Sequence, residues 1–252
     1  LSGTLALSLP LGTTLAVLLF RTQFPGRSLA RWLLILCLFV PPTIVASSWQ
    51  ATLGPHGLLS LDLWSIPDGR LWTTGLAAAI WTHSLSAIPW VTFLVGIGLT
   101  WVDPEAEEEA SLAVSASRVL CLVTLPRTRA SLLGAGLFIA LQTAGDASIA
   151  ELTLVPTLAE EVRTQFALGQ AGLGRTLALA LPPLALAALA VAALLAHLER
   201  TLPPLIAPAR SVRVLLLAGP AVRIAVAFAL IGLLAAPLFS LAWRVGLVGH
   251  PG

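Results

Sequence analysis

The chain has 252 residues, of which 57% are hydrophobic and only 10% are charged. An ordinary soluble domain carries about 25% charged residues, so this composition excludes a soluble protein and predicts a polytopic membrane protein with lipid as its main solvent. The net charge of +2 gives no basic footprint for nucleic acid.

Six apolar stretches are each long enough to cross a bilayer, which takes about 20 residues of helix. They are continuous and do not alternate, which argues against the strands of an outer-membrane barrel. The sequence therefore predicts an all-α polytopic bundle of about six transmembrane helices. In chain order the stretches are 1–20, 30–52, 74–101, 130–150, 174–198 and 221–243.

The arginines between these stretches set the orientation of the bundle, because positive charge is retained on the cytoplasmic side. Most of the 14 basic residues follow the first, third and fifth stretches. Among these, Arg21 is assigned to the first cytoplasmic loop. The loops expected in the cytoplasm are 21–29, 102–129 and 199–220, and those expected outside are 54–72 and 152–173.

The loop after the third stretch has an unusual composition. An acidic run at 105–109 suits a helix N-terminus, and small residues follow it, which allows another backbone to approach closely. Pro126 is expected to end this short helix and direct the chain into the fourth stretch. The pattern favours a docking element near 104–118. From the acidic run alone, a solvated turn is the alternative.

The same loop resembles the EAA loop of ATP-binding-cassette (ABC) importer permeases, with the signature Glu-Ala-Ala-x-x-x-Gly and a distant Leu-Pro. Serine replaces the glycine, and the stretch before the proline is about two residues shorter than usual. The resemblance implies that this loop, at 103–126, docks an ATPase. The matching residues are Glu109, Ala110, Ser111, Ser115, Ala116, Ser117, Arg118 and Pro126.

Two further segments resemble the same family. The turn 20–27 is similar to the Arg-Thr-x-x-Pro-Gly-Arg turn after an early permease span, and 157–166 is similar to an outward segment of ferric-iron-type permeases. The resemblance implies a type I importer fold. Residues 1–200 are then a permease domain lacking its start, and 201–252 are a linker and the first span of a second half.

The family resemblance implies a transport subunit of the inner (plasma) membrane that imports a small solute. The ferric-iron-like order of the segments suggests a metal ion such as ferric iron, or another small, oxyanion-type solute. The implied partners are a cytoplasmic ATPase dimer, an extracytoplasmic solute-binding protein, and a second permease half or homologous subunit in the lipid bilayer. An alternative is a secondary transporter that works without an ATPase.

Residues that support catalysis or bind a cofactor are scarce. The chain has no lysine, which excludes a P-loop, and it has neither a Gly-x-Ser-x-Gly elbow nor a His-Glu-x-x-His pair. Cys37 and Cys121 lie in or beside apolar runs and are interpreted as buried thiols. We expect no enzyme activity, no cofactor and no metal site, so ATP hydrolysis belongs to a partner.

Four polar residues in the apolar stretches are candidates for the transport pathway, because polar groups inside a membrane are costly and commonly functional. Asp146 is either a pathway or gate residue or a plain interfacial carboxylate. His83 is favoured as a hydrogen-bonded histidine of the bundle over a metal ligand. Gln142 and Thr143 either line the pathway or join helices.

Overall fold

The computed structural model describes residues 1–23, 26–53, 74–168 and 173–201, with isolated positions between 219 and 242. Every regular element in these segments is helical, which confirms the all-α prediction. The sixth predicted stretch, 221–243, and the proposed second half from 201 onward lie almost wholly outside the described residues. The elements are α1 (Ser2–Arg21), α2 (Arg27–Leu38), α3 (Pro42–Leu53), α4 (Gly75–Thr100), α5 (Pro104–Ala113), α6 (Ala116–Val119), η1 (Leu120–Thr124), α7 (Leu125–Arg127), α8 (Arg129–Gly145), α9 (Ser148–Thr153), α10 (Leu158–Leu168) and α11 (Leu173–Thr201).

Within the described part of the chain, three helices are long and apolar enough to cross a membrane, namely α1, α4 and α11. A fourth crossing is added if α2 and α3 together form one broken span. The predicted stretch 130–150 is divided, because α8 ends after 17 residues at Gly145. At about 1.5 Å per residue, α8 lies at the short end of spanning length.

The predicted stretch 30–52 is not one straight helix, since α2 and α3 meet at an angle of 103°. The break falls just before Pro42, at a Pro-Pro pair that begins with Pro41. Proline lacks the N–H of a helical bond and disfavours helical geometry in the residue before it. Irregular backbone at membrane depth has to be covered by protein, and here the bend lies against α4.

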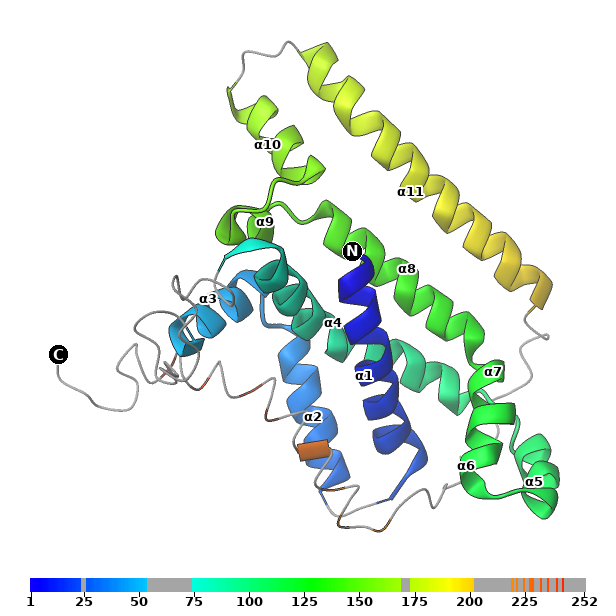
Figure 1. Cartoon of the computed structure of the whole chain (residues 1–252). Coiled ribbons are helices and arrows are strands. Elements are labelled where there is room, and N and C mark those ends of the chain that lie inside the picture. Colours follow the sequence, from blue (N-terminus) through cyan, green and yellow to red (C-terminus); the bar gives the residue numbers. More distant parts are fainter. Residues whose placement is uncertain are drawn as a thin grey trace, which may run out of the picture.

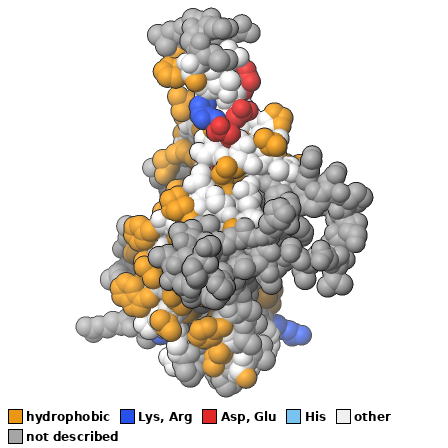
Figure 2. All heavy atoms as spheres, turned by 90° about the vertical axis from the view of Figure 1, so that its left-hand side faces the viewer, with side chains coloured by type: hydrophobic (Ala, Val, Ile, Leu, Met, Phe, Trp, Pro, Cys, Tyr) orange, Lys and Arg blue, Asp and Glu red, His pale blue; other side chains and the backbone are white. Residues whose placement is uncertain are grey.

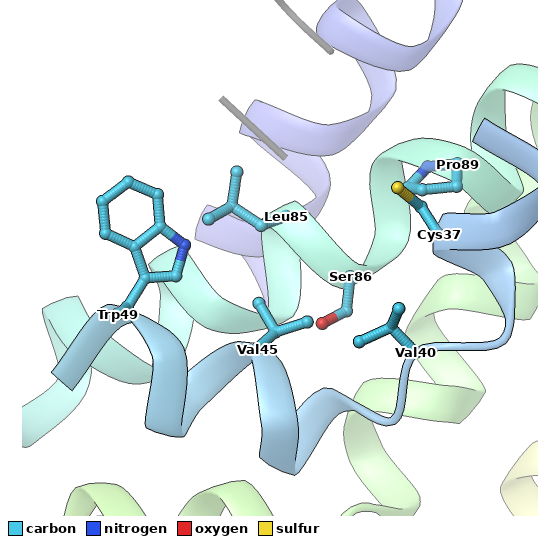
Figure 3. Close-up of a pocket in the computed structure, with 7 residues that line it drawn as sticks. All are labelled: Cys37, Val40, Val45, Trp49, Leu85, Ser86 and Pro89. Carbon is cyan, nitrogen blue, oxygen red and sulfur yellow. The ribbon is translucent and has the colours of Figure 1, made fainter. Parts of the chain in front are cut away.

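A small, mostly apolar pocket lies inside this bend. Figure 3 shows Val40 and Val45, on either side of the break, facing Leu85 and Ser86 of α4. Because Val40, Val45 and Leu85 are apolar, the pocket is not a polar binding site, and these side chains cover the bend on the side of α4. The residues that line it are Cys37, Val40, Val45, Trp49, Leu85, Ser86 and Pro89.

The core of the described fold is the packing of α1 and α8 on α4. Gly12 of α1 lies so close to α4 that a Cβ atom there would be 2.6 Å from Cβ of Val91. The hydroxyl of Thr92 donates to the carbonyl oxygen of Gly12 at 3.3 Å. Close approach through small residues is the usual way that membrane helices associate, and it fixes α1 along α4.

The two segments that the arginine pattern places on opposite sides of the membrane lie at opposite ends of the molecule. Figure 1 shows α5 and α6 beyond the lower end of α1, and α9 and α10 at the upper end. On the face drawn in Figure 2, charged side chains gather near the upper end, and hydrophobic side chains are spread over the surface below them. The sidedness itself stays a prediction.

Candidate ATPase-docking site

The docking loop begins with a well-capped helix. The Oδ1 atom of Asp103 accepts a hydrogen bond from the backbone N–H of Glu105 at 3.0 Å, and Pro104 occupies the first turn. Glu105 and Glu107 place negative charge in the same turn, where the helix dipole favours it. The acidic run therefore starts a helix, as predicted, and is more than a solvated turn.

The predicted docking helix is interrupted. Helix α5 ends at Ala113, and both Val114 and Ser115 have extended backbone angles before α6 begins at Ala116. The φ of Ser115 is −66°, which any residue adopts readily, so serine in place of glycine causes no strain here. The loop thus consists of two short helices that meet at Ser115.

Pro126 does not end the helix, contrary to the expectation from sequence. The chain stays helical from Ala116 through η1 to Arg127. The segment η1, just before Pro126, is a π-helix, whose wider turn accommodates a residue that lacks the N–H and crowds the preceding turn. The change of direction falls at Thr128, which precedes α8.

Most predicted docking residues reach the surface at this end of the molecule. Glu109, Ser115, Ser117, Arg118 and Pro126 are exposed, and Ala110, Ser111 and Ala116 are half-buried. The structure thus leaves these side chains accessible to a partner, and their docking role remains a prediction.

Sequence reasoning missed Leu112, which is 90% exposed on α5 among the small residues. A single exposed leucine is ordinary on a protein surface, but on this loop its side chain is accessible to a partner that docks there. Its place inside the acidic and small-residue segment was the available signal. Cys121, in η1, is also exposed, so the expectation of a buried thiol was wrong there, whereas Cys37 is half-buried.

A buried polar cluster lies beneath the docking helix. Arg21 forms an ion pair with Oε1 of Glu107, and the two side chains are 1% and 0% exposed. The hydroxyl of the buried Thr124 donates to the same oxygen at 2.6 Å. Arg21 is therefore the buried last residue of α1, not the cytoplasmic loop residue that its sequence position suggested. No local pattern could pair it with Glu107.

The candidate pathway residues lie where α4, α8 and α9 pack together. Oδ1 of Asp146 accepts hydrogen bonds from the N–H groups of Ser148 at 2.8 Å and Ile149 at 3.3 Å. Asp146 therefore caps α9 at the break after α8. Gln142 and Thr143 lie on the last turns of α8, and His83 lies on α4. All four candidates are half-buried, and their pathway role stays a prediction.

Comparison with known proteins supports the permease prediction. No protein-family model matches the chain. The molybdenum transport system permease protein ModB of Haemophilus influenzae is 29% identical over 161 residues, which cover 62% of this chain and 68% of the relative. The ModB protein of Escherichia coli K12 is 28% identical over the same shares. The chain is similar to permeases of molybdenum transport systems. The earlier preference for ferric iron receives no support from these relatives.

Proposed function

We propose that this chain is the membrane-spanning permease subunit of an ABC importer, and that its substrate is a tetrahedral oxyanion such as molybdate. The observation that carries the proposal is the docking loop, with its capped helix α5 and its exposed small side chains. The likeness to molybdenum permeases supports both the importer class and the substrate class.

The docking loop suits a separate ATPase because its exposed side chains are small. Ser115 lies at the junction of α5 and α6, with Ser117 beside it at 3.3 Å between the hydroxyl oxygens. Small side chains there let a partner's backbone approach closely, and the exposed Leu112 adds apolar area that a partner could cover. Glu109 adds a charge that orients the contact. The chain has no P-loop lysine, so a partner hydrolyses the ATP.

The opposite end of the molecule suits delivery of the substrate from outside. Helices α9 and α10 carry an exposed ion pair between Arg163 and Glu151, at 2.5 Å. We infer that a solute-binding protein docks over this end, and that Gln142 and Thr143, near the α8–α9 break, line the route inward. A second permease copy or half completes the pathway, because alternating access requires two bodies that move against each other.

Co-purification with the ATPase tests the proposal. The permease is expressed with its ATPase partner as wild type and as Ser115→Trp, Glu109→Lys and Ser115→Ala. Ser115→Trp is expected to lose the ATPase because a bulky group holds the two backbones apart. Glu109→Lys is expected to lose it because it reverses the charge that orients the contact. Ser115→Ala keeps the small size and is expected to retain the ATPase. Wild-type recovery of the ATPase with both disruptive variants would contradict the docking assignment.

The alternative, a secondary transporter that couples an ion at Asp146, makes a different prediction. Such a protein takes up solute at full rate without any ATPase. In our proposal, uptake by the permease alone is absent. The hydrogen bonds that Asp146 accepts from the α9 N–H groups give this residue a capping role. Comparing molybdate, sulfate and ferric iron as solutes separates the substrate classes.

A further inference from the structure

We propose that Arg21, Glu107 and Thr124 are positioning residues that transmit movement of the docking helix α5 to the first membrane helix and to the base of α8. This inference rests on the proposed function, because it assumes that an ATPase moves α5. We refer to these three residues as the linking cluster.

The linking cluster joins three segments through one atom. Oε1 of Glu107, on α5, accepts hydrogen bonds from both the guanidinium of Arg21 and the hydroxyl of Thr124. Arg21 is the last residue of α1, and Thr124 is the last residue of η1. The pairs are 86 and 17 residues apart in sequence. A shift of Glu107 therefore displaces two other segments at once.

Each of these two segments leads into the bundle. Helix α1 packs along α4 through the close approach at Gly12, so a pull on Arg21 acts on the central helix pair. The π-helical η1 continues through α7 to Thr128 and then to α8. π-Helical turns occur frequently at functional sites. Helix α8 carries the candidate pathway residues Gln142 and Thr143 at its far end.

The chemistry of the cluster suits transmission better than stability. A buried ion pair is often no more stabilising than apolar side chains of similar volume, because both charges lose their hydration. A charge-assisted hydrogen bond, however, has a defined direction, whereas apolar contact has none. The exposed pair of Arg163 and Glu151 at the other end lacks this burial, with side chains 52% and 60% exposed. Only the linking cluster couples a surface helix to a membrane helix in this way among the described residues.

The test uses the complete importer, reconstituted into vesicles with its ATPase and binding protein and supplied with radiolabelled molybdate. The double variant Arg21→Met/Glu107→Leu removes both charges together and leaves no unpaired buried ion. It is expected to keep its melting temperature and its bound ATPase, while the molybdate transported per ATP hydrolysed falls about tenfold, within the range for residues of a coupling network. Glu108→Gln, which removes the neighbouring exposed carboxylate, is expected to leave this ratio unchanged.

A second variant keeps the test decisive if the double variant does not fold. Thr124→Val preserves shape and removes only the hydroxyl donor to Glu107, and we expect about a threefold fall in the same ratio. A wild-type ratio in Thr124→Val, or in a folded double variant, would overturn the positioning role while the proposed function stands. Absence of ATP-dependent molybdate uptake by the wild-type importer would instead overturn the proposed function, and this inference with it.

Discussion

Removing the carboxylate of Glu107 should strongly destabilise the fold, because it breaks a buried ion pair. In Glu107→Ala, the guanidinium of Arg21 stays buried without its ion-pair partner. The buried hydroxyl of Thr124 also loses its closer acceptor at 2.6 Å and keeps only the carbonyl oxygen of Val119 at 3.5 Å. Both groups lie where water does not reach them, because Arg21 is only 1% exposed and Thr124 is fully covered.

The expected cost follows from this burial. Breaking a buried ion pair by deleting one partner costs about 3–5 kcal/mol, since the remaining charge is left uncompensated. For a chain of this size, 1 kcal/mol shifts the melting temperature by about 2–4 °C. Glu107→Ala should therefore lower the melting temperature by about 6–20 °C.

The assay is thermal unfolding of the purified permease in detergent, with Glu151→Ala as the matched control. Glu151 also loses an ion pair, but it and Arg163 are more than half exposed. An exposed pair of this kind is worth about 0–1 kcal/mol, so this control should change the melting temperature little. An equal shift of the melting temperature in the two variants would refute the reasoning, because it would mean that the burial of Arg21 and Glu107 does not affect stability.

Three further predictions concern packing, capping and exposure. Gly12→Ala should destabilise the fold by about 1–3 kcal/mol, because the new Cβ meets Val91. Gly134→Ala, with nothing within 4 Å of a new Cβ, should be neutral or stabilising in the same unfolding assay. Asp146→Ala should lower the free energy of unfolding by about 1 kcal/mol through loss of the α9 cap, whereas Asp146→Asn keeps the cap. If Asp146→Asn were fully stable but lost uptake, the charge of Asp146 would belong to the pathway. Cys121 should react with a maleimide added to inside-out vesicles but not to intact cells, and the reverse pattern would invert the topology.

The long helices could be predicted from composition and run length. The stretch 74–101 corresponds to α4, Gly75–Thr100, and 1–20 to α1, Ser2–Arg21, because an apolar run of this length has to satisfy its own backbone in lipid. The 103° bend between α2 and α3 could not be predicted, although Pro41 and Pro42 mark its position. A proline pair indicates a break but does not fix its angle, which depends on the packing against α4.

The docking loop was predictable in part for a similar reason. Its acidic start and small residues are local features, and they indicate a helix near 104–118. The interruption at Ser115 depends on how α5 packs against α6 and η1, which the sequence does not reveal. The pairing of Arg21 with Glu107 was beyond sequence reasoning altogether, because it joins two segments 86 residues apart and neither residue stands out from its charged neighbours.

Substrate choice was the weakest inference from sequence. The ferric-iron-like order of segments left both a metal ion and a small oxyanion-type solute open, because permeases of one architecture share that order and it does not encode selectivity. The oxyanion that we propose rests on the likeness to permeases of molybdenum transport systems, and its charge is opposite to that of ferric iron. Asp146, if it lined the pathway, would repel such an anion, and this favours its role as the cap of α9.

The most direct test of the account is transport of radiolabelled molybdate into vesicles that contain the permease, its ATPase and its binding protein. We predict that uptake requires ATP and the ATPase, and that it disappears in Ser115→Trp while the permease remains folded. Molybdate uptake that proceeds equally well without the ATPase would contradict the account.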